Sequence, residues 1–190
     1  MIDTISMQPR FAIGAAVLIA LTAGAEAQVV DLQRTISGVD VQTNDNFAFS
    51  VDVDQDILVV GSPMDNDRGN ASGSAYVFEG STGQQLYKLR ENDGAPGDLF
   101  GHSIAIDDGF IVVGAPRNND DGTNSGSVYI FDVTTGKELH KLTAADAGEG
   151  DQFGQDVAIE GNTIVIGAFR DGDNGVVSGS AYIFDALTWG

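Results

Sequence analysis

The sequence contains no cysteine, which excludes disulfide bonds, thiolate metal sites and lipid attachment through a cysteine. Basic residues are also scarce, with nine Lys and Arg against 28 Asp and Glu and a net charge of −19. A chain of this charge repels nucleic acid and anionic lipid, because it cannot supply the cations that neutralise phosphate groups. We therefore expect no nucleic-acid partner.

No segment beyond the N-terminal region is apolar enough to span a bilayer, which needs about 20 apolar residues. At the N-terminus, Arg10 precedes the apolar run FAIGAAVLIALTAG and the small-residue exit Ala25-Glu26-Ala27. This arrangement predicts a secretory signal peptide over residues 1–27. We expect a secreted product that is extracellular, periplasmic or on the cell surface, with no transmembrane anchor.

The rest of the chain has a globular composition that favours short strands joined by turns, with 42% hydrophobic residues and 25 glycines. Five kinds of position recur at intervals of 53 residues without a gap. They are Phe47, Phe100 and Phe153; Gly61, Gly114 and Gly167; Gly73, Gly126 and Gly179; Tyr76, Tyr129 and Tyr182; and Phe78, Phe131 and Phe184. A constant period of this length indicates a repeat architecture.

The middle copy predicts four strands in each repeat. We expect them at Ser103–Asp107, Phe110–Ala115, Ser127–Asp132 and Glu138–Leu142. Four-stranded antiparallel sheets repeated at this period form the blades of a β-propeller. The predicted fold class is therefore all-β, with β-propeller-type blades in about three 53-residue repeats.

Three repeats predict an incomplete propeller, because propellers close with about four to eight blades. We divide the chain after the signal peptide into an N-terminal strand in residues 28–44, blades at 45–97 and 98–150, and a truncated blade at 151–190. The N-terminal strand is in register with the fourth strands and is a candidate for closing the last blade. The chain is expected to be a fragment of a longer product or a unit that associates with itself through open blade edges.

The recurring residues resemble a known family. Phe100-Gly101, then Gly114-Ala115-Pro116, then Gly126-Ser127-Val128-Tyr129-Ile130-Phe131 are similar to the FG-GAP repeat, which builds the propeller of integrin α chains and of many bacterial secreted proteins. The resemblance implies a propeller and a role in adhesion. In integrin-type repeats the calcium loops lie between Phe-Gly and Gly-Ala-Pro, where this chain has only a tight hairpin. The integrin calcium sites are therefore not carried over.

One short stretch, Gly101-His102-Ser103-Ile104-Ala105, is close to the Gly-x-Ser-x-Gly turn of serine hydrolases. Three observations argue against that role: the serine becomes Asp156 in the third copy, the final glycine is Ala105, and a strand follows where the elbow needs a helix. The two histidines occupy different repeat positions and predict no triad or zinc site. We therefore expect no catalytic residues and no enzyme activity.

The loop after the second strand of each repeat carries alternating oxygen side chains followed by a glycine. The candidate ligands for calcium are Asp65, Asp67, Asn118, Asp120, Asp171 and Asp173. Calcium takes about six to eight oxygen ligands, which suits such loops. The alternative is a set of Asx turns, in which these side chains bond to their own backbone.

Two functional hypotheses follow. The first is a secreted, non-enzymatic module, stabilised by calcium, that binds an unidentified protein or glycan in adhesion through loops on a rigid scaffold. The second is the propeller portion of a larger secreted enzyme, a hydrolase whose catalytic part lies elsewhere.

Overall fold

The structure, a computed structural model, describes residues 34–173 and 175–188. The predicted signal peptide lies outside these residues. The described residues from 36 onward form one compact unit, in which there are three open antiparallel sheets and no closed barrel. The first sheet contains β1 (Val51–Asp54), β2 (Ile57–Ser62), β3 (Ser74–Glu79) and β4 (Gln85–Leu89); the second contains β5 (Ser103–Asp107), β6 (Phe110–Ala115), β7 (Ser127–Asp132) and β8 (Glu138–Leu142); the third contains β9 (Asp156–Glu160), β10 (Thr163–Ala168) and β11 (Ser180–Asp185).

The predicted all-β fold class is confirmed, and the four strands expected in the middle copy have the bounds that the sequence predicts. The first two sheets have the simple order β1-β2-β3-β4 and β5-β6-β7-β8, because tight hairpins join consecutive strands. At the β5–β6 turn Asp108 and Gly109 both have positive φ, 44° and 89°, as a two-residue hairpin requires. The third sheet has three strands among the described residues.

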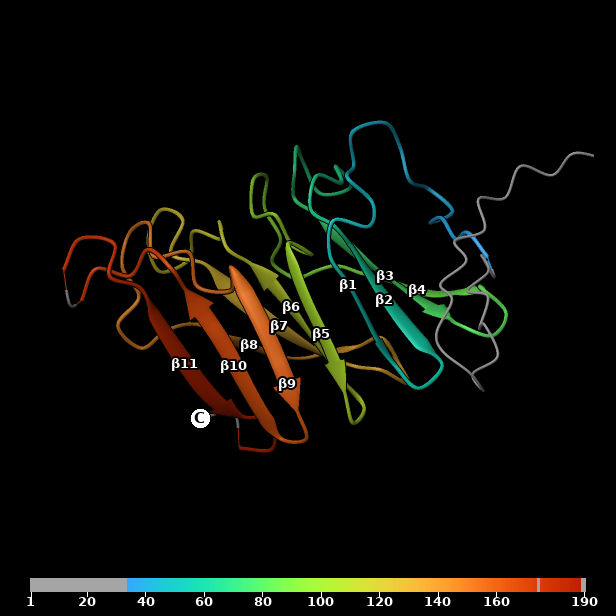
Figure 1. The fold of residues 1–190 in the computed structure, drawn as a ribbon. Helices are drawn as coiled ribbons and strands as arrows, with labels where there is room; N and C mark the ends of the chain where they lie inside the picture. Colours follow the sequence, from blue (N-terminus) through green and yellow to red (C-terminus); the bar gives the residue numbers. More distant parts are fainter. Residues whose placement is uncertain (1–33, 174, 189–190) are drawn as a thin grey trace, which may run out of the picture. The chain divides into compact units, whose positions relative to one another are not determined.

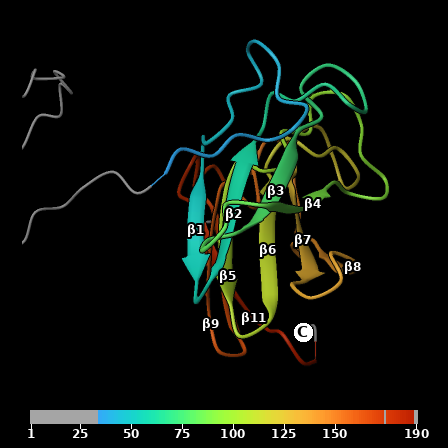
Figure 2. The same ribbon diagram turned by 90° about the vertical axis from the view of Figure 1, so that its right-hand side faces the viewer.

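The sheets lie next to one another through their innermost strands, with β5 in contact with both β1 and β9 (Figure 1). Figure 2, turned by 90°, shows β1, β2 and β3 of the first sheet side by side in front, with β5, β6 and β7 of the second sheet behind them. Apolar side chains fill the space between successive sheets. The core between the first two sheets joins Val59 and Val77 of one sheet to Ile104 and Ile111 of the next. This burial is the main stabilising term available to a chain without disulfides.

Glycines allow the sheets to approach at each junction. Gly73 forms a parallel bridge with Phe100, whose N–H donates to the Ser72 carbonyl at 3.0 Å. A Cβ at Gly73 would overlap the Phe100 carbonyl oxygen, and its φ of 92° is in the region that favours glycine. Gly126 makes the same bridge with Phe153. Gly73 and Gly126 therefore serve the contact between successive sheets.

Residues 34–44, the described part of the predicted N-terminal strand, contain turns and no strand. The remainder of that predicted strand lies outside the described residues. In the part of the chain that the structure describes, no helix has the length and apolar character needed to cross a membrane.

Candidate functional site

The first sheet holds an acidic cluster that surrounds a lysine. Lys88 Nζ, on β4, lies 2.8, 2.9 and 2.7 Å from carboxylate oxygens of Asp40, Asp65 and Asp67. The hydroxyl of Tyr76, opposite Lys88 on β3, lies 3.0 Å from both Asp40 and Asp65, and the ammonium stands 5.0 Å from the centre of the Tyr76 ring. Burial opposes the charge on Lys88, but its hydrogen bonds to the three aspartates outweigh that effect and raise its pKa.

The second sheet repeats this arrangement 53 residues later. Lys141 Nζ, on β8, lies 2.7 Å from Asp93 and also pairs with Asp120. The Tyr129 hydroxyl donates to Asp93 at 2.9 Å, and Asn118 replaces the aspartate found at this position in the first sheet. Burial, followed by the charge of Asp93, raises the pKa of Tyr129, so this hydroxyl stays protonated.

The third sheet has the same acids without a cation. The Tyr182 hydroxyl lies 2.7 Å from Asp171 and 3.0 Å from Asp146, and the carboxylates of Asp146, Asp171 and Asp173 lie within 4.8 Å of one another. No Lys or Arg within residues 34–173 and 175–188 forms an ion pair with these three aspartates. A hydrogen bond shared with Asp146, together with the charge of Asp171, raises the pKa of Asp173. This group, in which Asp146 and Asp173 are exposed and Asp171 is buried, could bind a metal ion.

The predicted calcium residues thus lie in three clusters of different chemistry. In the first two clusters a lysine ammonium occupies the centre of the oxygen ligands, and only the third offers three carboxylates to another cation. The first member of each loop also forms an Asx turn, because the backbone N–H two residues later donates to it. Asx turns, the alternative that the sequence left open, are therefore present in all three loops, and calcium binding stays a prediction.

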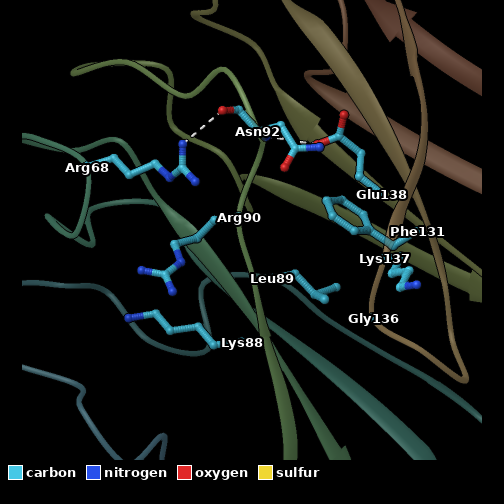
Figure 3. A pocket seen from close by; sticks show the side chains of 9 residues that line it. All are labelled: Arg68, Lys88, Leu89, Arg90, Asn92, Phe131, Gly136, Lys137 and Glu138. Carbon is cyan, nitrogen blue, oxygen red and sulfur yellow. Dashed lines mark hydrogen bonds between the residues drawn. The ribbon is translucent and has the colours of Figure 1, made fainter.

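A cationic cleft lies where the outer strands of the first two sheets meet. Its volume is about 450 Å³, and Figure 3 shows the side chains that line it. The lining residues are Arg68, Lys88, Leu89, Arg90, Asn92, Phe131, Gly136, Lys137 and Glu138. Four of the nine Lys and Arg residues of the whole sequence are among them. In a chain of net charge −19 this is a marked local concentration of positive charge.

The basic side chains of the cleft differ in their partners. Lys88 is held in the first acidic cluster, and Arg90 reaches Asp67 at 2.8 Å. Arg68 donates to the Asn92 carbonyl at 2.9 Å, while Asn92 N–H donates to Glu138 across the junction (Figure 3). Arg68, Arg90 and Lys137 are exposed. Their side chains are available to a ligand, because none of them is enclosed by the fold.

Beside the cleft, Glu91 is completely buried. Its exposed fraction is 0%, and neither carboxylate oxygen has a hydrogen-bond partner in another residue. Burial, reinforced by the nearby Asp98, raises the pKa of Glu91 to about 8. The positions 53 residues before and after Glu91 hold Gly38 and Ala144, so this buried acid has no equivalent in the other repeats.

The serine and histidine of the hydrolase-like stretch have structural partners. Ser103 is buried on β5, and its hydroxyl donates to the Gly154 carbonyl of the next sheet at 2.8 Å. Ser50 makes the same bond to Gly101 at 2.9 Å. The His102 ring lies 4.9 Å from the Phe49 ring, and burial lowers the pKa of His102. The repeated serine joins neighbouring sheets through its hydroxyl.

Four-stranded sheets joined in series by the same glycine bridge define a β-propeller-like repeat protein. The chain belongs to the FG-GAP repeat family: the family model for the FG-GAP repeat matches residues 31–78, 84–131 and 137–184, more than half of the sequence. It is also similar to human integrin alpha-11, with 31% identity over 121 residues. That alignment covers 55% of this chain and 10% of integrin alpha-11, so the chain spans a small part of that relative.

Several residues of the clusters were missed in the sequence. Asp40, Asp93 and Asp146 complete the three acidic clusters, and Lys88 and Lys141 fill two of them. The sequence could have revealed these residues, since the aspartates and the lysines each recur at intervals of 53 residues. The cleft had no such signal, because it forms where two sheets meet and its exposed basic residues, Arg68, Arg90 and Lys137, do not recur.

Proposed function

We propose that the chain is a secreted, non-enzymatic binding module that recognises an acidic group on a protein or glycan partner and serves adhesion. The observation that supports this proposal is the cationic cleft between the first two sheets. Adhesion is proposed from the family, since integrin alpha-11 is the named relative.

The chemistry of the cleft favours a carboxylate or a sulfate. Arg68 and Arg90 carry planar guanidinium groups, which bind such oxyanions through paired hydrogen bonds, and Lys137 adds a mobile positive charge. An acidic protein surface repels most anions at a distance, so a ligand of this class is selected by the local cluster and not by the net charge. Phe131 and Leu89 supply an apolar base for the non-polar part of a ligand.

The experiment measures binding of two probes, a sulfated oligosaccharide and an acidic peptide, by calorimetry. We expect one of them to bind and the double substitution of Arg90 and Lys137 by Ala to weaken that binding about tenfold or more. The matched control replaces Arg117 and Arg170, which are exposed cations outside the cleft, and makes the same change in net charge. If both double variants lose affinity equally, the effect comes from overall charge and the cleft is not the site.

Calcium is proposed as a ligand of the third acidic cluster, Asp146, Asp171 and Asp173, where no lysine of the described residues intervenes. A calcium titration should raise the melting temperature of the protein and a chelator should reverse the rise. An unchanged melt across the titration would contradict the proposal.

Secretion is proposed from the signal peptide and is tested by N-terminal sequencing of the exported protein, which should begin at Gln28. The absence of catalysis is proposed because the only hydrolase-like serine among the described residues, Ser103, is buried and bonded to Gly154. Turnover of an ester substrate that is lost in Ser103→Ala would contradict it.

A further inference from the structure

The four basic side chains of the cationic cleft are matched by four carboxylates. One of these acids, Glu138, lines the cleft itself, and the other three surround Lys88. Those three are Asp40, Asp65 and Asp67, of which Asp67 also pairs with Arg90. Four positive charges therefore face four negative ones, so the cleft offers well-placed N–H donors without a surplus of positive charge.

Two guanidinium groups in the cleft keep donors for a ligand. Figure 3 shows Arg68 and Arg90 on the same side of the cleft and Lys137 on the other side. Arg90 Nη1 lies 2.8 Å from Asp67, and Arg68 Nη1 donates to the Asn92 carbonyl at 2.9 Å. A guanidinium group carries five N–H donors, so each arginine retains others. This arrangement suits one carboxylate, which takes paired hydrogen bonds from arginine.

A ligand with several negative charges meets repulsion outside the cleft. The chain carries 28 Asp and Glu and a net charge of −19. Two partly exposed acids border the cleft: the side chain of Asp93, which follows Asn92, is 46% exposed, and that of Asp40, which pairs with Lys88, is 44% exposed. Juxtaposed like charges oppose binding, so a sulfated polysaccharide with its repeated negative charges fits this surface poorly.

We propose that the partner of the cleft is a basic protein segment that presents one acidic side chain, an aspartate or glutamate flanked by lysine or arginine. The carboxylate binds to Arg68 and Arg90, and the flanking bases lie against the bordering acids, among them Glu138 and Asp93. Attraction between the acidic module and a basic partner speeds their encounter, and the carboxylate fixes the position of the segment. This inference rests on the proposed function, because it specifies which acidic group the cleft recognises.

The test compares the affinity of the full chain for four pentapeptides with blocked ends, KGEGK, GGEGG, EGEGE and KGQGK, by calorimetry. We expect KGEGK to bind about fivefold tighter than GGEGG, and EGEGE to bind more weakly than both. Replacing the glutamate by glutamine, as in KGQGK, should weaken binding about tenfold. Added salt should weaken the binding of KGEGK, because it screens the attraction between opposite charges.

Two pairs of protein variants locate the effect and determine its sign. Arg68→Gln should weaken the binding of KGEGK about tenfold, whereas Arg117→Gln, which removes an exposed cation outside the cleft, should change it less than about twofold. Glu138→Gln keeps an oxygen for the Asn92 N–H and loses one charge, so it should weaken KGEGK and strengthen EGEGE. Glu160→Gln makes the same change in net charge on β9 and should affect neither peptide.

The outcomes separate this inference from the proposed function. Tighter binding of EGEGE or of a sulfated oligosaccharide than of KGEGK would overturn the inference, while the cleft would still recognise an acidic group. Equal affinity for KGEGK and KGQGK would also overturn it, because attraction to the acidic surface would then suffice without a carboxylate. Equal affinity for KGEGK and GGEGG would exclude a role for the flanking bases. If neither the peptides nor the oligosaccharide bind at millimolar concentration, the inference and the proposed function both fail.

Discussion

Replacing Glu91 by glutamine should stabilise the protein, and by an amount that depends on pH. In the unfolded chain this carboxyl group has a pKa of 4.5, whereas burial raises it to about 8 in the folded protein. Between these two values the folded state binds more protons than the unfolded state, so the free energy of unfolding falls as pH rises. The slope is about 1.4 kcal/mol per pH unit for this one group, and the accumulated cost at pH 7 is about 3 kcal/mol.

Glutamine has nearly the same shape and no charge, so Glu91→Gln removes this cost. Near pH 4.5 the two proteins should have similar stability, with the variant slightly weaker because a buried amide also lacks partners. At pH 7 the variant should exceed the natural protein by about 3 kcal/mol, and by more at pH 8. Urea unfolding followed by circular dichroism at pH 5, 6, 7 and 8 measures the difference directly.

The control for this prediction is Glu160→Gln, which removes an equal charge from an exposed position on β9. Its effect on stability should be within about 0.5 kcal/mol and nearly independent of pH. A stability difference between Glu91→Gln and the natural protein that is the same at pH 5 and at pH 8 would refute the reasoning. It would mean that Glu91 is charged in the folded state and finds a partner or water there.

Two further changes test the sheet junctions and the lysine clusters. Gly101→Ala should lower the free energy of unfolding by about 2 kcal/mol or more, because Gly101 has a φ of 84° and a Cβ there would overlap the Ser74 carbonyl oxygen. Ala48→Gly, at the same repeat position, should raise the free energy of unfolding by up to about 1 kcal/mol, since Ala48 already has a φ of 68°. Chemical denaturation measures the stability of both variants, and equal effects of the two substitutions would contradict this explanation. Lys88→Met should cost about 3 kcal/mol at pH 7, because it leaves three carboxylates without their counter-charge. Added calcium should restore part of the melting temperature of Lys88→Met, and a melting temperature that neither falls on the substitution nor responds to calcium would show that the lysine is not the counter-ion of this cluster.

The repeat period made the fold predictable. Because the recurrence of Phe47, Phe100 and Phe153 needs no gaps, the three repeats could be aligned and read for strands together. The polar turn at Asp108 and Gly109 then fixed the hairpin register, and the strand bounds of the middle sheet follow from it. A structural role for Gly73 and Ser103 could also be predicted, since a residue that recurs in a repeat usually serves packing.

The candidate sites were harder to predict from the sequence, because they depend on contacts between segments that are distant in the chain. Lys88 is 48 residues from Asp40, and the two meet because β4 pairs with β3 and the turn that holds Asp40 lies against Tyr76 of β3. Alternating acids in a loop are equally compatible with calcium and with a lysine from a neighbouring strand, so the loop sequence alone does not distinguish them. The cleft depends on how two sheets meet, which the sequence does not specify. Glu91 has no equivalent in the other repeats, so aligning the repeats could not identify it.

The lysines of the first two clusters have a consequence for how the protein responds to its surroundings. Each is a counter-ion that the chain carries with it, so dilution, chelation or a change of divalent ion concentration cannot remove it. The first two sheets are therefore expected to keep the same charge balance in media of widely different mineral content. Among the described residues, the proposed calcium site at Asp146, Asp171 and Asp173 is where we expect a dissolved cation to change the charge balance.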